Sequence, residues 1–189
     1  LSGLLRHHCT IGIGFAYMNL GYARKEQGDY RAARQYYLSA LPQLRKEGYA
    51  PNVSEALINL GDISRFLREY EAARKYYRQA AQEYPEDADR LDELLGWTDA
   101  DQHRYREALI HFTKYCGQTP CAADVARIMG HCTEMLGDTN EANHQYRLAL
   151  ESATTLYDSS VVQSYIGNTL LRRKQPEAAL QVFQQALHN

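Results

Sequence analysis

The chain has 189 residues, of which 44% are apolar and 23% are charged, a composition typical of a protein that folds in water. Its 21 basic and 23 acidic residues leave a formal net charge of −2. This balance argues against nucleic acid and anionic lipid as partners, and no apolar stretch is long enough to predict a transmembrane helix.

An apolar residue followed by glycine marks five segments along the chain. These pairs are Leu20-Gly21, Leu60-Gly61, Leu95-Gly96, Met129-Gly130 and Ile166-Gly167. Alanine stands twelve residues after each glycine, at Ala33, Ala73, Ala108, Ala142 and Ala179. An aromatic residue follows four positions later, at Tyr37, Tyr77, Phe112, Tyr146 and Phe183. One register shared by five segments indicates an internal repeat.

Each repeat is predicted to form two helices. The residue five before each glycine is apolar, and with the residue just before the glycine it makes an i, i+4 stripe on the first helix. Turn signals such as Gly28-Asp29 and Gly137-Asp138 then separate it from the second helix, which carries the alanine and the aromatic residue. The aromatic side chain is expected to fill space between adjacent repeats.

In chain order, residues 1–9 are expected to be the remnant of a preceding helix or an N-terminal extension. The repeats follow at approximately 10–49, 50–86, 87–120, 121–156 and 157–189. Because a lone helix pair cannot bury its apolar face, the five pairs are expected to stack. The predicted fold class is therefore all-α, with residues 1–189 forming one right-handed α-solenoid of five antiparallel helix pairs.

This pattern resembles the tetratricopeptide repeat, whose signature is W-x2-L-G-x2-Y, then A-x3-F, then A and P. The second repeat matches it best, from Leu60-Gly61 through Tyr77 to Pro85. The third departs most, since Asp92 and Asp99 stand where apolar or aromatic residues are usual. The 40-residue first repeat is similar to the longer variant found in kinesin light chain and in MalT-like bacterial regulators.

The resemblance implies that the first helices line a concave groove that holds an extended or helical peptide. Groove-facing positions then lie three before, two before and one after each glycine. The candidate groove residues are Met18, Asn19, Tyr22, Ile58, Asn59, Asp62, Glu93, Trp97, Arg127, His131, Tyr165 and Asn168. Asparagine could pair with a peptide backbone, and the aromatic residues could supply anchoring area. Packing between repeats is the alternative role for each of these residues.

Two further features bear on the partner. Family members that bind the carboxylate end of chaperone tails use Lys and Asn where this chain has Met18 and Tyr22, so no such clamp is expected. The stretch 86–101 holds seven acids against one base, Arg90, which predicts attraction of a basic partner segment. A solvated face with acids near a helix N-terminus is the alternative.

The four cysteines stand at irregular spacing, which does not suggest a disulfide framework and indicates a cytoplasmic location. Five residues have metal-ligand side chains: His111, Cys116, Cys121, His131 and Cys132. None of them forms a pair with zinc spacing, so no metal or cofactor is expected. Cys116 is predicted to be a buried packing thiol, and a Cys116–Cys121 disulfide in a secreted protein is the alternative.

The sequence contains no catalytic or nucleotide-binding motif, so the chain is not expected to be an enzyme. The main hypothesis is a protein–protein interaction module whose groove binds a partner peptide or protein segment. One alternative is a regulatory or sensor arm of a larger signalling or transcription protein, which binds a small effector or a neighbouring domain. Another is a structural assembly scaffold.

The last predicted helix carries Leu180, Phe183 and Leu187, and no capping helix follows it. An uncapped terminal pair leaves apolar surface in water. We therefore expect end-to-end self-association through the terminal helices, and we expect the chain to be a piece of a longer protein.

Overall fold

The computed structural model describes residues 12–118 and 120–188, which form ten α-helices and one short 3₁₀ helix without a strand. The α-helices are α2 (Ile13–Glu26), α3 (Tyr30–Glu47), α4 (Ala50–Phe66), α5 (Tyr70–Glu83), α6 (Ala88–Asp101), α7 (Tyr105–Gln118), α8 (Ala123–Met135), α9 (Thr139–Ser152), α10 (Leu156–Arg172) and α11 (Pro176–His188). The predicted all-α solenoid class is confirmed. No helix among these residues is long and apolar enough to cross a membrane. The predicted extension at residues 1–9 lies outside the described residues.

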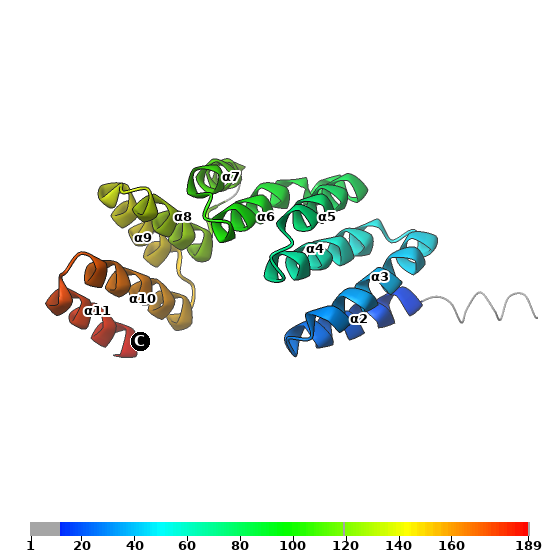
Figure 1. The fold of residues 1–189 in the computed structure, drawn as a ribbon, viewed down its shortest axis with the longest axis horizontal. Helices are drawn as coiled ribbons and strands as arrows, with labels where there is room; N and C mark the ends of the chain where they lie inside the picture. Colours follow the sequence, from blue (N-terminus) through cyan, green and yellow to red (C-terminus); the bar gives the residue numbers. More distant parts are fainter. Residues whose placement is uncertain (1–11, 119, 189) are drawn as a thin grey trace, which may run out of the picture. The chain divides into compact units, whose positions relative to one another are not determined.

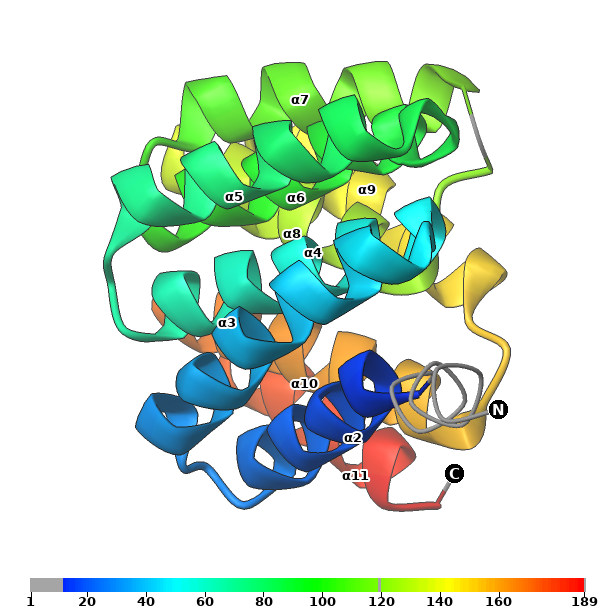
Figure 2. The same ribbon diagram turned by 90° about the vertical axis from the view of Figure 1, so that its right-hand side faces the viewer.

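The chain divides into two compact units, Leu1–Thr98 and Asp99–Asn189, with the boundary inside α6. In the first unit α2 packs against α3 and α4 against α5 (Figure 1). In the second unit α8 packs against α9 and α10 against α11. Figure 2 shows the paired helices running side by side and connected by short turns, so the two helices of a pair are antiparallel.

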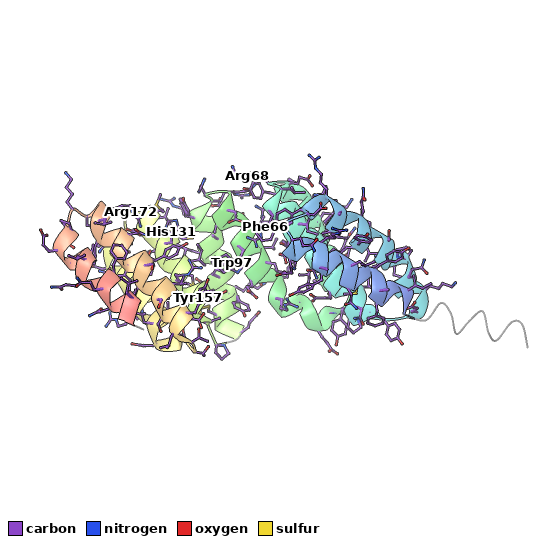
Figure 3. All side chains as sticks on the ribbon, turned by 90° about the horizontal axis from the view of Figure 1, so that it is seen from below. Phe66, Arg68, Trp97, His131, Tyr157 and Arg172 are labelled. Carbon is purple, nitrogen blue, oxygen red and sulfur yellow. A yellow bond between two sulfur atoms is a disulfide. The ribbon has the colours of Figure 1, made fainter. Side chains whose placement is uncertain are left out.

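A left-handed residue recurs in the turns between paired helices, always five residues before the repeat alanine. These residues are Gly28, Arg68, His103, Gly137 and Lys174, with φ between 58° and 91°. Glycine adopts this conformation without steric cost, whereas arginine, histidine and lysine do not. Glycine therefore marks two of these turns in the sequence. The other three carry no such signal, and one of them holds the Arg68 labelled in Figure 3.

Four of the repeat glycines, Gly21, Gly61, Gly130 and Gly167, lie directly under the aromatic ring of their own helix pair. A Cβ built on Gly61 would lie 2.2 Å from the Tyr77 ring, and one on Gly130 would lie 2.8 Å from the Tyr146 ring. Both rings are almost fully buried. The aromatic side chain was expected to fill space between repeats; within its own repeat it also packs on the glycine, where a side chain would leave no room for the ring.

Helix starts follow from local side-chain chemistry. The Asp138 carboxylate accepts a hydrogen bond from the Glu141 N–H at 3.0 Å, as the capping-box spacing predicts. Thr155 and Asp158 form the complete reciprocal box at the start of α10. Pro176 occupies the first position of α11, where its missing N–H breaks no hydrogen bond.

Cys116 and Cys121 form a disulfide, with their Cα atoms 4.7 Å apart. The packing-thiol prediction for Cys116 is therefore wrong, and the alternative pairing holds. The bond links the last turn of α7 to the segment that precedes α8. Cys132 is a buried free thiol, and burial raises its pKa to about 12. Because disulfides are typical of oxidising compartments, the cytoplasmic location stays only a prediction.

Candidate functional site

In the second unit, helices α7, α8 and α10 bring one cation and three rings together. Arg127 and His131 stand four residues apart and therefore share one face of α8. The Arg127 guanidinium carbon lies 4.4 Å from the centre of the Tyr165 ring on α10. The His131 ring lies edge-on to two tyrosines, 6.1 Å from Tyr165 and 6.0 Å from Tyr105. We call these four residues the aromatic–cation row.

Two nitrogen atoms of the row are buried without a hydrogen-bond partner among the described residues. They are Nη1 of Arg127 and Nδ1 of His131. Arg127 also makes no ion pair within the described part of the chain. A buried polar group without a partner costs about 1–3 kcal/mol. A ligand that offered partners to these atoms would recover part of that cost.

The His131 imidazole is held neutral at neutral pH. Burial lowers its pKa, and the nearby positive charges of Arg172 and Arg127 lower it further, against the opposing effect of Glu134. A neutral imidazole has one N–H donor and one acceptor nitrogen. The row therefore contains one permanent cation, Arg127, and one neutral residue that both donates and accepts.

Beside this row, Glu134 on α8 forms hydrogen bonds to two neighbouring helices. Its carboxylate accepts hydrogen bonds from Arg172 at 2.7 Å, Thr169 at 2.8 Å and Tyr146 at 3.2 Å. Burial alone would raise the pKa of Glu134, but the hydrogen bonds from Arg172 and Thr169 lower it below its ordinary value. Burial raises the pKa of Tyr146 to about 12. One carboxylate thus connects α8, α9 and α10.

A cavity of about 170 Å³ lies between the first turns of α8 and α10. It is lined by Ala123, Asp124, Arg127, Tyr157, Asp158, Val161 and Val162. Arg127 belongs both to this cavity and to the aromatic–cation row. Figure 3 shows Tyr157 at one end of the second unit's helices and Arg172 at the other, so cavity and Glu134 cluster lie at opposite ends of α10.

In the first unit, the candidate residues on α4 bond to neighbouring side chains or lie in the core. Asn59 is only 6% exposed, accepts a hydrogen bond from Lys25 at 2.6 Å, and donates to the Glu55 carbonyl and carboxylate oxygens. Asp62 accepts from the Tyr77 hydroxyl at 2.8 Å. Burial raises the pKa of Asp62 despite that bond. Ile58 is a core residue.

The remaining candidates do not gather into one cluster. Met18 packs against the core of the first unit, while Glu93 and Trp97 lie half-buried on α6. Asn19 and Asn168 are exposed and make no hydrogen bond within the described residues. Tyr22 is 55% exposed, with the Lys25 ammonium 5.5 Å from its ring centre.

Several site residues were not among the candidates: Tyr105, Glu134, Arg172 and most of the cavity lining. A signal for Tyr105 did exist, because tyrosine stands three residues before the repeat alanine in three repeats, at Tyr30, Tyr70 and Tyr105. Glu134 and Arg172 carried no such signal. They lie 38 residues apart in the sequence and meet only through the packing of α8 against α10.

The acidic stretch forms less of a surface than its composition suggests. The Asp92 and Asp99 side chains are buried. Asp99 lies 3.6 Å from the Arg104 guanidinium and 3.7 Å from the His111 ring, so it contacts side chains of its own unit. Attraction of a basic partner segment stays a prediction.

The zinc alternative finds no support in the described part of the chain. No three His, Cys, Asp or Glu side chains come together there as a metal site requires. Two of the five residues considered, Cys116 and Cys121, are bonded to each other.

On α11, Leu180 and Leu187 are 58% and 83% exposed, and self-association through this helix also stays a prediction.

Comparison with known proteins agrees with this geometry. The sequence model of the tetratricopeptide repeat family matches residues 13–85. A search among curated proteins gave no match. Solved structures resemble the chain at low identity, and at that level the likeness shows the fold.

These structures include three examples that cover nearly the whole chain. BtubC (BKLC) from P. vanneervenii is 16% identical, with a TM-score of 0.75 over 97% of this chain and 83% of that one. A thermophilic tetratricopeptide repeat protein from Thermus thermophilus is 18% identical, with a TM-score of 0.72 over 93% and 90%. MamA from Desulfovibrio magneticus RS-1 is 14% identical, with a TM-score of 0.66 over 93% of each chain. The family match shows that residues 13–85 consist of tetratricopeptide repeats, and the solved structures show that the chain has the fold of tetratricopeptide repeat proteins, which is in general an interaction or scaffold fold.

Proposed function

We propose that the chain binds a peptide or protein segment of a partner along its first helices, and that the aromatic–cation row makes the central contact in the second unit. The observation that supports this is the pair of buried nitrogens on Arg127 and His131 that lack partners. Native proteins satisfy nearly all buried polar groups, so exceptions call for an explanation. Both atoms are closed to solvent in this structure, so a peptide backbone would pair with them once the Arg127 and His131 side chains turn toward it.

The composition of the row agrees with this role. Tyrosine and arginine are enriched among the residues that dominate binding energy at protein interfaces. Tyr165 is held between Arg127 and His131, so it loses little conformational freedom when a partner binds. The Glu134 hydrogen bonds fix α8 and α10 against each other. The row is therefore preorganised.

Selection from a random peptide library would test the proposal. Peptides selected on the intact chain would be labelled and titrated by fluorescence anisotropy. A Tyr165→Ala, His131→Ala double variant should weaken their binding at least about tenfold. Arg147→Ala serves as the control, because Arg147 is exposed on α9 and makes no described contact.

Circular dichroism must show that the double variant keeps the helix content of the parent. Selected peptides that bind a folded double variant as tightly as the parent would contradict the role of the row. If no peptide is enriched over several rounds, groove binding itself is refuted.

A further inference from the structure

The cavity between α8 and α10 has the dimensions and the charges of a small-molecule site. Its volume is about 170 Å³. A protein cavity of about 150 Å³ holds a benzene molecule, so this one has room for a ligand of one small side chain and its attached groups. Val162 is buried and lines the cavity with Val161 and Ala123, which gives it an apolar wall. Tyr157 is 77% exposed at its rim.

Charges of both signs line this cavity without neutralising one another. Arg127 supplies a guanidinium, and Asp124 and Asp158 supply carboxylates. Arg127 forms no ion pair with either of them, because its guanidinium is held over the Tyr165 ring instead. The opposite charges are therefore kept apart in one small volume.

Each carboxylate also keeps an oxygen available. Asp124 accepts one hydrogen bond, from the Val125 N–H to Oδ1 at 2.8 Å. Asp158 uses Oδ2 for the cap at Thr155. Neither Oδ2 of Asp124 nor Oδ1 of Asp158 accepts a hydrogen bond from another described residue.

Among simple ligands, the signs of these charges favour one class. An anion would bind Arg127 but would face two carboxylates, and a cation would bind the carboxylates but would face Arg127. A zwitterion carries both charges a few ångströms apart and can pair with both sides at once. The apolar wall then suits an aliphatic side chain between the two charged groups.

We propose that the α8–α10 cavity binds a free aliphatic α-amino acid. Arg127 binds the carboxylate, Asp124 and Asp158 bind the ammonium group, and Val161 and Val162 contact the side chain. This site goes beyond the peptide contact proposed above and shares only Arg127 with it. The chain would then respond to an amino acid as well as to a partner segment.

Leucine is the first probe, measured by saturation-transfer NMR and by isothermal titration calorimetry. It should bind with a Kd of about 1 mM or lower, the affinity that a ligand of this size reaches with two ion pairs and one apolar contact. Leucinamide lacks the carboxylate and N-acetyl-leucine lacks the ammonium group. Each should bind at least about tenfold more weakly than leucine. Equal binding of all three compounds would overturn the zwitterion assignment.

Variants separate this site from the peptide contact. Asp124→Asn removes one partner of the ammonium group, and Val161→Trp fills the cavity. Both should lose leucine binding and keep the binding of a selected peptide, because neither residue belongs to the aromatic–cation row. The Tyr165→Ala, His131→Ala double variant should lose the peptide. Arg147→Gln is the control for charge and should keep both.

Each outcome decides the matter. Leucine binding that survives both Asp124→Asn and Val161→Trp would place the ligand elsewhere and overturn the proposal. The proposal would also be overturned if leucine, isoleucine, valine and methionine all failed to bind at about 10 mM, a concentration well above the expected Kd. Loss of leucine binding in these variants, with peptide binding unchanged, supports the cavity independently of the proposed function.

Discussion

The two units place different chemistry at the same repeat positions. Three residues before the glycine, the first unit has Ile58, which is 3% exposed in the core, and the second has Arg127, which keeps a nitrogen without a partner. One residue after the glycine, Asp62 bonds to Tyr77, whereas Nδ1 of His131 bonds to no described residue. Repeat position determines where a side chain faces; its neighbours decide whether it stabilises the fold or remains available to a ligand.

The glycine–aromatic contact is common to both units, and its disruption should have the largest effect. Gly61→Leu should lower the free energy of unfolding by about 3 kcal/mol or more, because even a Cβ would lie 2.2 Å from the Tyr77 ring. Gly130→Leu should cost less, since the corresponding distance to Tyr146 is 2.8 Å. Urea unfolding followed by circular dichroism measures both.

Gly117→Ala is the matched control for these two variants. Nothing lies within 4 Å of a Cβ built at Gly117 on α7. Alanine there should stabilise the helix by about 0.5–1 kcal/mol. If Gly61→Leu costs no more stability than Gly130→Leu, the Cβ–ring distances do not determine the cost of the added side chain.

The second prediction separates the structural polar residue from the available one. Asn59→Ala should cost about 2 kcal/mol, because it removes three hydrogen bonds, one from Lys25 and two to Glu55, at a nearly buried position. Arg127→Ala should cost about 1 kcal/mol or less, since Arg127 loses its contact with the Tyr165 ring but makes no hydrogen bond or ion pair in the described structure. If urea unfolding gives the same stability loss for Asn59→Ala and Arg127→Ala, the two residues do not differ in their contribution to the fold.

The third prediction concerns pH and the Glu134 cluster. Arg172→Gln should cost about 1 kcal/mol at neutral pH, because the nearly buried Glu134 carboxylate loses its charged partner. Since the pKa of Glu134 is lowered in the folded state, its stabilisation is present above the ordinary value of 4.5 and disappears as the pH falls through the folded value. The difference between parent and variant should therefore shrink below about pH 4.

Unfolding at matched pH steps measures this difference. Thr169→Val removes the hydrogen bond that the uncharged Thr169 hydroxyl donates to Glu134. The stability difference between parent and this variant should also shrink at acid pH, by a smaller amount. A gap between parent and Arg172→Gln that stays constant down to acid pH would show that Arg172 acts through packing and not through Glu134.

Much of the fold could be predicted because its signals are local and repeated. The glycine and aromatic positions recur in one register because the ring packs on the glycine in four of the pairs, at Gly21, Gly61, Gly130 and Gly167. The turns were harder, because Arg68, His103 and Lys174 take a conformation that their residue types do not indicate. The Cys116–Cys121 bond also lacked a signal, as nothing in a five-residue spacing distinguishes a pair from two buried thiols.

The site was predictable only in part. Repeat position put Arg127, His131 and Tyr165 among the candidates, and the structure brings their side chains together. It did not reveal that Asn59 and Asp62, in equivalent places, are held by Lys25 and Tyr77. Those partners come from other helices, so their contacts depend on side-chain reach across a packed interface, which a spacing rule does not contain.

The glycine–aromatic contact also limits where this chain can change its length. The distance from glycine to aromatic residue is 16 positions in every repeat, whereas the distance between successive glycines varies from 34 to 40. The extra residues of the first repeat lie after Tyr37, in the longer α3 and the start of α4. An insertion within a hairpin would move the ring off its glycine, but one between hairpins would not. Tags, epitopes or fluorescent domains should therefore be tolerated near Gly48 or Ala153 and rejected at the turns inside the pairs.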